Sequence, residues 1–306
     1  MTSRTNTKPE NFDSFWQTVL EELASLPPAA EVEEIPLRST EFATTYGVRL
    51  TSIGPYRIFG YLSIPKSADG GFPARYFLPR YGSVADLVPQ GSSNSQRRDY
   101  VTFSICARGQ RRSDSPYAAS FPGQLTDGID DPATYIYRGI VADCCRGLEY
   151  LAQHPAVDGT RIAAIGTDLA LITASLSSLA THLVCTPVTF HQALERAAAT
   201  SAYPLEELND YLRLNPDRRD DVDRTLSHYD LRWFAPGVNA TSLLMAEAAG
   251  GPLDGAALAP MAEDIKGDAL VRESENSGYR DGVFSELWLT EQLGMPEPSL
   301  PPHWRQ

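Results

Sequence analysis

The segment Arg161-Ile-Ala-Ala-Ile-Gly-Thr-Asp-Leu-Ala170 decides the fold. In this segment one apolar run is followed by Gly-Thr-Asp and then directly by a second apolar run. Residues 161–165 predict a buried strand, and residues 171–179, almost wholly apolar or small, predict a helix packed under a sheet. Asp168 stands at the tip of the turn between them. A sharp turn from strand to helix exposes the side chain at its tip above the sheet. Asp168 is therefore the first candidate for a functional residue.

Composition limits the class of protein and the kind of partner. The chain has 306 residues, of which 42% are hydrophobic and 21% charged, as in a folded globular protein of one large α/β domain or two small ones. Its formal charge of −13 at pH 7 argues against nucleic acid and against an anionic membrane, because either would repel an acidic surface. The expected partner is a small-molecule substrate.

The cysteines and the N-terminus indicate the compartment. Cys106, Cys144, Cys145 and Cys185 include neither a CxxC pair nor the histidine spacing of a zinc site. We therefore expect a reduced, cytoplasmic protein with no metal ion and no other cofactor. The N-terminus lacks the apolar core of a signal peptide, and no stretch approaches the roughly 20 apolar residues that span a bilayer. A soluble protein is expected.

Hydrophobic periodicity predicts the other elements. In residues 11–26 apolar side chains repeat every three and four positions, which predicts an amphipathic helix that ends at Pro27-Pro28. Alternating apolar and polar residues predict antiparallel edge strands at 32–45, 48–53 and 56–64, with breaks at Tyr46-Gly47 and Gly54-Pro55. Further strands are predicted at 75–78, 100–106, 182–186, 242–246 and 269–273, and further helices at 135–154, 255–265 and 284–293.

Three segments are expected to lie outside the sheet. They are a polar loop at 82–98, an irregular loop insertion at about 107–134, and a helical insertion at about 187–237 with helices at 205–214 and 217–226. Strands that alternate with helices form a mostly parallel central sheet with helices on both faces. We expect such an α/β fold, as a single domain over residues 1–306.

Three motifs carry a resemblance to a known family: Arg108-Gly-Gln110, Tyr135-Ile-Tyr-Arg-Gly139 and Thr225-Leu-Ser-His-Tyr-Asp230. Over nearly its whole length the chain resembles the acetyl xylan esterases and cephalosporin C deacetylases, which are serine esterases. The first motif is similar to that family's RGQ signature. The resemblance implies the α/β-hydrolase fold, with Arg108 and Gln110 near the pocket, where they mainly brace the surrounding loops.

The resemblance also implies where a catalytic triad would lie. Family members carry a Ser nucleophile in a GGSQGG turn, an Asp after a late strand and a His in a C-terminal His-Glu pair. In this sequence Asp168 takes the place of the Ser. The acid position falls near Gly250, with Asp254 the nearest carboxylate, and the His position falls at Tyr279. All three triad members are therefore expected to be replaced.

An oxyanion hole is implied to remain. The family's His-Gly-Tyr turn corresponds to Pro79-Arg80-Tyr81, so the backbone N–H of Tyr81 would be one donor and that of Leu169 the other. Arg80 brings a cation that could bind substrate or pair with Asp168. Arg108 and Gln110 could also contact substrate, although bracing is the simpler role. Tyr279 could donate a proton from the old His position.

Ordinary serine-esterase chemistry is not expected, because loss of the nucleophile or the base of a triad costs on the order of 10⁶ in rate. The leading hypothesis is a non-hydrolytic enzyme of natural-product metabolism. In such a lyase Asp168 would act as general base on a carbon-bound proton, and acetate would leave by β-elimination with the oxyanion donors stabilising it. A poorly solvated carboxylate with a raised pKa would suit this task.

Two alternatives stay open. The protein could be a catalytically inactive pseudoenzyme with a binding or assembly role. Residues 107–134 match the family's interface loop, so the resemblance implies a homo-oligomer. Alternatively, Asp168 could be the nucleophile of a hydrolase similar to haloalkane dehalogenases and epoxide hydrolases, whose ester intermediate needs a His base. Of the five histidines, only His191 is expected near the mouth of the site.

Overall fold

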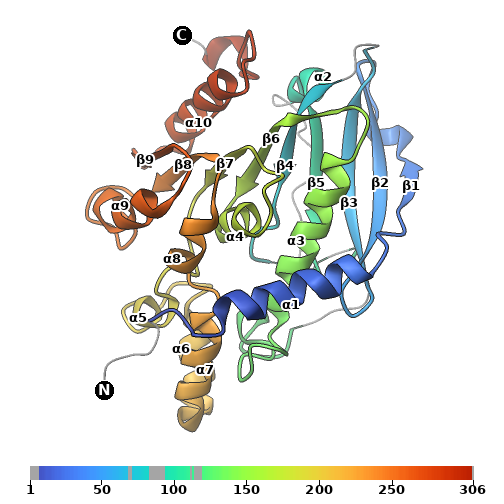
Figure 1. Ribbon diagram of the computed structural model, residues 1–306. Coiled ribbons are helices and arrows are strands. Elements are labelled where there is room, and N and C mark those ends of the chain that lie inside the picture. Colours follow the sequence, from blue (N-terminus) through green and yellow to red (C-terminus); the bar gives the residue numbers. More distant parts are fainter. Residues whose placement is uncertain (1–6, 68–70, 83–93, 111, 114–118, 305–306) are drawn as a thin grey trace.

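The strands form a single mixed sheet (Figure 1). The computed structural model describes residues 7–67, 71–82, 94–110, 112–113 and 119–304. Within them the sheet has nine strands in the order β1-β2-β3-β5-β4-β6-β7-β8-β9. The strands are β1 (Glu31–Glu34), β2 (Ala43–Ser52), β3 (Tyr56–Pro65), β4 (Phe72–Phe77), β5 (Val101–Cys106), β6 (Val157–Gly166), β7 (His182–Cys185), β8 (Thr241–Ala246) and β9 (Ala269–Glu273).

The type of pairing between neighbouring strands changes once across the sheet, from antiparallel to parallel. The pairs from β1 to β5 through β2 and β3 are antiparallel, and the pairs from β5 to β9 through β4, β6, β7 and β8 are parallel. The predicted mostly parallel sheet with an antiparallel edge is confirmed. Because parallel strands end at the same edge, the loops that follow β4, β6, β7 and β8 come together there.

The antiparallel edge differs from the prediction in two details. The predicted break at Tyr46-Gly47 is wrong, because β2 runs through it. A Cβ atom on Gly47 would lie 3.0 Å from the ring of Phe59, so this glycine allows close packing and makes no turn. The predicted strand at 32–45 is also wrong, since β1 ends at Glu34 and a 3₁₀ helix, Pro36–Arg38, follows it.

The helices are α1 (Phe12–Ser25), α2 (Gln96–Asp99), α3 (Ile136–Ala152), α4 (Asp168–Leu176), α5 (Ala193–Ala197), α6 (Glu206–Leu214), α7 (Arg219–Ser227), α8 (Leu231–Phe234), α9 (Gly255–Asp264) and α10 (Gly278–Gln292). Two of them begin earlier than predicted. The helix expected from residue 171 begins at Asp168. The helix expected from residue 284 begins at Gly278, because the side chain of Ser277 accepts the N–H of Arg280 and so caps its first turn.

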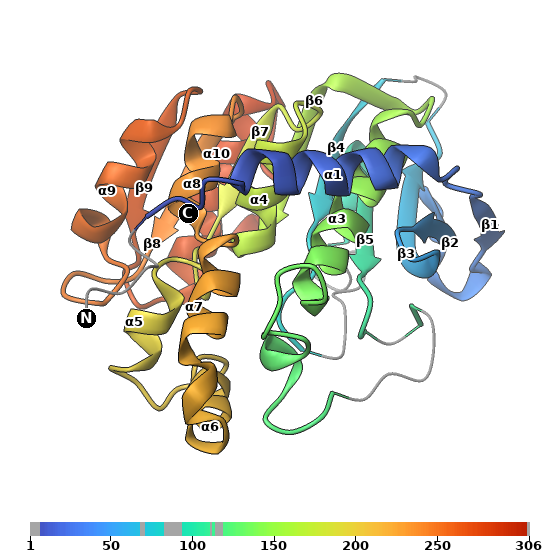
Figure 2. The ribbon, with the colours of Figure 1, turned by 60° about the horizontal axis from the view of Figure 1, so that its bottom comes forward.

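Helices cover both faces of the sheet, as predicted. In β6, Ile162 and Ala164 belong to the main apolar cluster, while Ala163 between them belongs to a second cluster with Leu289 of α10 and Leu293, which follows that helix. Since side chains alternate across a strand, these clusters lie on opposite faces. Figures 1 and 2 show α3 and α4 on one face with α1 across them, and α10 on the other.

The predicted helical insertion lies between β7 and β8 and contains α5, α6, α7 and α8. Figure 2 shows α5, α6 and α7 beyond one end of the sheet, next to the segment that leads into α3. The described part of the loop insertion at 107–134 is irregular apart from a 3₁₀ helix, Gln124–Thr126. The loop expected at 82–98 ends in α2. Residues 83–93, 111 and 114–118 of these two loops lie outside the described residues.

Candidate functional site

The turn from β6 into α4 places Asp168 at the first position of the helix. Thr167 precedes the helix, and its carbonyl accepts the N–H of Ala170 at 2.9 Å. Gly166 allows the strand to pass close to β4, because a Cβ atom there would lie 3.1 Å from the Cβ of Leu78. The sharp turn predicted from the sequence is therefore formed, with a glycine at its most crowded point.

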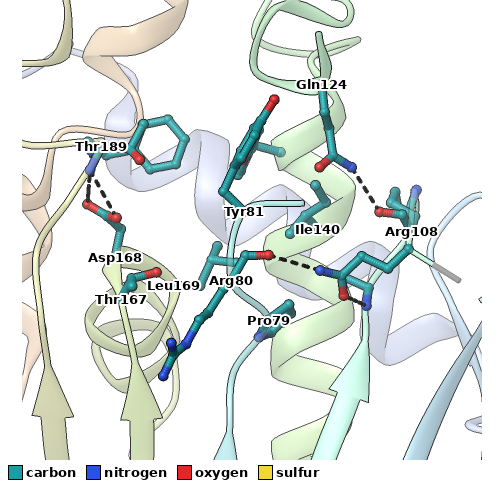
Figure 3. Close-up of a pocket in the computed structure, with 14 residues that line it drawn as sticks. Pro79, Arg80, Tyr81, Arg108, Gln124, Ile140, Thr167, Asp168, Leu169 and Thr189 are labelled. Carbon is teal, nitrogen blue, oxygen red and sulfur yellow. Dashed lines mark hydrogen bonds between the residues drawn. The ribbon is translucent and has the colours of Figure 1, made fainter. Parts of the chain in front are cut away.

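The carboxylate of Asp168 is bound by three consecutive backbone N–H groups. Its Oδ1 accepts from Phe190 at 2.9 Å, from Thr189 at 3.0 Å and from Val188 at 3.3 Å. Its Oδ2 accepts from Thr189 at 3.1 Å and from Val188 at 3.3 Å. We call residues 188–190 the strap. In Figure 3 the carboxylate points toward the strap and away from Tyr81.

Asp168 is a buried charge with strong local compensation. Only 3% of the residue is exposed. Burial raises the pKa of the Asp168 carboxyl, while the N–H groups of Phe190, Thr189 and Val188 oppose this rise because they stabilise the ionised form. The carboxylate thus holds the loop after β7 against the start of α4. An uncharged acceptor would bind the same N–H groups less strongly.

A pocket lies beside this turn and contains most of the predicted site residues (Figure 3). The pocket is narrow: its cavity volume is about 20 Å³, within about 380 Å³ of empty space that includes open solvent. The lining residues are Pro79, Arg80, Tyr81, Ala107, Arg108, Gln110, Gln124, Tyr137, Ile140, Thr167, Asp168, Leu169, Thr189 and Phe190. The structure therefore brings together Asp168, Tyr81, Leu169, Arg80, Arg108 and Gln110, which the sequence had singled out one by one.

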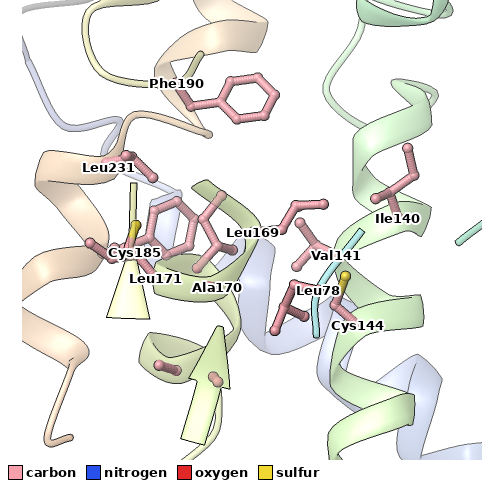
Figure 4. Close-up of a cluster of buried hydrophobic side chains, with 14 of the residues drawn as sticks. Leu78, Ile140, Val141, Cys144, Leu169, Ala170, Leu171, Cys185, Phe190 and Leu231 are labelled. Carbon is pink, nitrogen blue, oxygen red and sulfur yellow. The ribbon is translucent and has the colours of Figure 1, made fainter. Parts of the chain in front are cut away.

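The two N–H groups expected to form an oxyanion hole belong to residues of this pocket. Neither the backbone N–H of Tyr81 nor that of Leu169 donates to an acceptor in the described part of the chain. Leu169 is the second residue of α4, where backbone N–H groups have no partner within the helix. These donors are available to a ligand that carries a hydrogen-bond acceptor. The side chain of Leu169 packs into the apolar cluster below the pocket (Figure 4).

Arg108 is fixed by an ion pair behind the pocket. Its Nη2 donates to Oδ1 of Asp143 at 2.8 Å and its Nε to Oδ2 of the same carboxylate at 3.0 Å. Its Nη2 also donates to the carbonyl of Ile53 at 3.0 Å. A Cβ atom on Gly139 would lie 2.3 Å from the Arg108 guanidinium, so a glycine is needed on α3 at this point. These contacts fit the bracing role expected for Arg108.

Gln110 braces the turn that carries Tyr81. Its Nε2 donates to the carbonyls of Arg80 at 2.9 Å and Gly82 at 3.0 Å, and its Oε1 accepts the N–H of Ala107 at 3.1 Å. The amide is thus engaged at both ends. In Figure 3 the Arg80 side chain runs away from the Asp168 carboxylate, whose hydrogen bonds go to the strap.

The helical insertion contacts Tyr81, a residue of the pocket, through Glu207 of α6. Its carboxylate accepts the hydroxyl of Tyr81 and, at 3.0 Å, the backbone N–H of Leu125. Glu207 is only 3% exposed, and burial raises its pKa. Sequence reasoning missed this residue. Helical spacing could have found it, because Glu207 shares a face with Leu208 and Tyr211, whereas its neighbour Glu206 pairs with Arg213 on the charged face.

His191 and Tyr279 are not among the residues that line the pocket. His191 follows the strap and is only 5% exposed, and burial lowers its pKa. Its Nδ1 has no hydrogen-bond partner within the described residues. Tyr279 is 45% exposed in the first turn of α10, and its ring lies 4.8 Å from that of Trp304.

The carboxylates nearest the expected acid position serve the local backbone. Asp254 caps α9, since its Oδ1 accepts the N–H of Ala257 at 3.0 Å and its Oδ2 that of Gly250 at 3.0 Å. These N–H groups lower the pKa of Asp254. Oε2 of Glu247 accepts the N–H of Leu253 at 3.1 Å. Neither carboxylate lines the pocket.

The described residues show neither a metal-binding cluster nor a membrane-spanning helix. They contain no group of three or more His, Cys, Asp or Glu side chains placed to hold a metal ion. None of the helices formed by these residues combines the length and the apolar character needed to cross a bilayer.

Known proteins similar to this chain include acetyl esterases. Residues 2–249 match the model of the acetyl xylan esterase (AXE1) family. Acetyl esterase Axe7A of Xylanibacter ruminicola is 25% identical over 244 residues, which cover 74% of this chain and 53% of that protein. The chain therefore spans about half the length of this curated relative.

Solved structures of two such enzymes share the fold. An acetyl xylan esterase from Paenibacillus sp. R4 aligns with a TM-score of 0.79 and 24% identity over 94% of this chain and 95% of its own. Acetyl xylan esterase 1 from Thermoanaerobacterium sp. JW/SL YS485 aligns with a TM-score of 0.80 and 21% identity over the same shares. The predicted α/β-hydrolase fold is thus confirmed. Since the family model matches most of the sequence, the chain belongs to the acetyl xylan esterase family.

Proposed function

We propose that this protein is a member of the family that has given up serine-esterase chemistry and keeps the pocket as a binding site for a small neutral carbonyl compound, such as an acetyl ester. One observation carries the proposal. Asp168, at the position that the resemblance assigns to the nucleophile, has both carboxylate oxygens bound by backbone N–H groups of the strap. This observation supports the binding role considered from the sequence.

The hydrogen bonds of Asp168 oppose a role as nucleophile. Attack on a carbonyl or alkyl carbon would require one oxygen to leave its N–H donors, and the charge-assisted bonds that it would give up are among the stronger ones in proteins. An ester hydrolysed in this pocket would also pass through an anionic tetrahedral intermediate. Next to an ionised carboxylate in a poorly solvated site, that second negative charge is disfavoured.

The same geometry favours a neutral ligand with a carbonyl oxygen. Such an oxygen can accept the N–H groups of Tyr81 and Leu169, which have no acceptor among the described residues. Apolar walls are available from Ile140, Phe190 and Leu169. A few placed polar groups in a mostly apolar hollow are typical of small-molecule sites. The ligand therefore needs an acceptor at one end and a small apolar group at the other, as an acetyl ester has.

A lyase that eliminates acetate is the second candidate, and the position of Asp168 favours it. The residue lines the pocket, and burial raises the pKa of its carboxyl, which brings a general base closer to neutral pH. This mechanism requires one carboxylate oxygen to leave the strap when substrate binds. If it operates, Asp168→Asn abolishes conversion of a β-acetoxy substrate while the ester still binds.

The proposal is tested by separating binding from turnover. We expect 4-nitrophenyl acetate to hydrolyse at the buffer rate, and ethyl acetate to show saturation-transfer NMR contacts with the protein. Thr189→Phe should remove these contacts, because the larger side chain fills the pocket while the Thr189 backbone N–H remains. Thr200→Trp, which changes a different hollow, is the matched control and should leave them unchanged. Fast nitrophenol release, or contacts that survive Thr189→Phe, would refute the proposal.

A further inference from the structure

A second hollow lies on the other side of the strap from the pocket. It has a volume of about 390 Å³, and Val188 of the strap forms one wall. The other lining residues come from α5, from the segment between α5 and α6, and from the loop after β8: Arg196, Ala199, Thr200, Ala202, Tyr203, Pro204, Leu205, Glu247 and Pro252. In Figure 2, α5 and the loop after β8 lie at the same end of the sheet.

Arg196 is the cation of this hollow, and no carboxylate of the described residues forms an ion pair with it. Its Nη1 donates to the carbonyl of Val188 at 2.8 Å and to that of His191 at 3.5 Å. Within the described residues the guanidinium forms no ion pair, and its Nε is buried without an acceptor. Burial lowers the pKa of Arg196, while the charges of Asp168 and Glu247 oppose this change without touching it.

A guanidinium in this state favours an anionic ligand. A partly buried charge without a counter-ion is unfavourable, because it has lost water and gained no opposite charge in return. A carboxylate restores what is missing, since the planar guanidinium can donate more than one hydrogen bond to it. Nη1 of Arg196 already donates to backbone carbonyls. The remaining N–H donors of the guanidinium therefore define where the ligand's carboxylate binds.

The other residues of the hollow determine which non-acidic part and which net charge the ligand can have. Tyr203 and Val188 are 63% and 36% exposed, and with Pro204 and Pro252 they offer an apolar surface next to the cation. Glu247 brings a negative charge to the same hollow and so disfavours a ligand with a second carboxylate. The combination fits a monocarboxylate with an apolar body.

We propose that this hollow is a second small-molecule site, which binds an aryl- or alkyl-substituted monocarboxylic acid with its carboxylate on Arg196. The site goes beyond the function proposed for the pocket. The two have no lining residue in common, although residues of the strap line both: Thr189 and Phe190 line the pocket, and Val188 lines the hollow.

The test uses 3-phenylpropionate as probe and isothermal titration calorimetry on the full chain. The acid should bind, and its uncharged analogue 3-phenylpropionamide should bind at least about tenfold more weakly, since it gives up the charge-assisted hydrogen bonds. Arg196→Gln should weaken the acid by a similar factor, and Arg196→Lys should restore part of the affinity. Phenylsuccinate, a dianion, should bind more weakly than the monoanion.

Two further variants guard against indirect effects. Because Arg196 also bonds the strap, Arg196→Gln could act through loop geometry alone. Thr200→Trp fills the hollow and leaves Arg196 in place, so it must also abolish binding of the acid. Arg213→Gln, on the exposed face of α6, is the charge-matched control and should not change it. Absence of binding to the wild-type chain, equal affinity in Arg196→Gln, or loss with Thr189→Phe but not with Thr200→Trp would each overturn the proposal.

Discussion

At the scale of single residues, the proposed function gives Asp168 a structural role. The turn presents it where the resemblance expects a nucleophile, yet its oxygens bind the N–H groups of residues 188–190. A carboxylate offers two oxygens with about four acceptor sites, whereas a serine hydroxyl offers one oxygen with two. Under the proposed function the side chain is a local anchor for the strap and not a reactive group.

The first prediction concerns this anchor. Asp168→Asn should lower the free energy of unfolding by about 1–3 kcal/mol, because the amide NH₂ would face backbone donors and leave them unsatisfied. Urea unfolding followed by circular dichroism measures the change. Asp217→Asn, on an exposed segment of the insertion, is the control and should stay within about 0.5 kcal/mol of the wild type. A variant as stable as the control would mean that the strap does not depend on the carboxylate.

At the scale of elements, α10 is attached to the sheet by a buried ion pair. Nη1 and Nη2 of Arg75 on β4 donate to the two carboxylate oxygens of Glu286 at 2.7 and 2.8 Å. The Arg75 guanidinium also lies 4.0 Å from the ring centre of Tyr100. Glu286 in turn accepts the N–H of Ser299 at 2.8 Å, which fixes the segment after the helix. One pair thus holds both α10 and the chain that follows it.

Removing one partner of this pair should be costly. Glu286→Gln leaves the Arg75 charge buried without a counter-ion, so we expect a loss of about 3–5 kcal/mol in the free energy of unfolding. The double variant Arg75→Met/Glu286→Leu should recover most of that loss, because it buries no charge. Glu275→Gln, which breaks an exposed pair with Arg280, should cost at most about 1 kcal/mol. If the double variant is no better than Glu286→Gln, the charge is not the cause.

The position of α6 over the pocket should depend on pH through Glu207. Burial raises the pKa of Glu207 above its value in the unfolded chain, so the folded protein binds the proton more tightly. Its contribution to the free energy of unfolding is therefore largest below the unfolded pKa of about 4.3 and declines as pH rises through the folded pKa. Glu207→Gln has no such titration. The stability difference, wild type minus variant, should fall from acidic to neutral pH in urea titrations.

A constant or rising difference would contradict this prediction, since it would place the ionised Glu207 in a favourable environment. Glu206→Gln is the matched control. Glu206 is the preceding residue of α6 and pairs with Arg213 on the charged face, where its pKa is lowered mainly by hydrogen bonds from Asn209 and Arg213. Its own contribution to stability should therefore run in the opposite direction and shrink as pH falls.

At the scale of the whole molecule, the apolar pattern was enough to predict the layers of the fold. Alternating buried strands and helices predict a parallel sheet because burial on both faces leaves continuous apolar runs, as in residues 161–165. Details that depend on tertiary packing were not predictable. In the sequence Gly47 indicates a turn. In the fold the ring of Phe59 from another strand occupies the space of its missing side chain, and this contact cannot be read from the local sequence.

The same limit applies to the site. The positions of Asp168, Tyr81 and Leu169 follow from the turn and from the resemblance, and the structure places them in one pocket. The partners of Asp168 could not be foreseen, because they are backbone N–H groups that almost any residue supplies. They lie about twenty positions later in the chain, brought into reach by the parallel pairing of β6 and β7. For Glu207, helical spacing was the one feature of the sequence that indicated a buried position.

The pocket and the Arg196 hollow share one peptide segment, and this predicts coupling between them. The N–H of Val188 donates to Asp168, and the carbonyl of Val188 accepts from Arg196. A change in the strap therefore alters both sites. Asp168→Asn, which does not line the hollow, should change the affinity for 3-phenylpropionate by about two- to thirtyfold, the range of a coupling of about 0.5–2 kcal/mol.

Thermodynamic linkage makes this prediction reciprocal. If both sites bias one position of the strap, ethyl acetate in the pocket changes the affinity for 3-phenylpropionate by some factor. The acid must then change the affinity for the ester by the same factor. Calorimetric titration of the acid with and without ester measures one direction, and saturation-transfer competition the other. Asp217→Asn should leave both unchanged. If each ligand changes the affinity for the other by the same factor, and that factor differs from one, the result supports a shared strap. Independent binding in the wild type, together with wild-type affinity in Asp168→Asn, would instead show that residues 188–190 hold the same position whichever site is occupied.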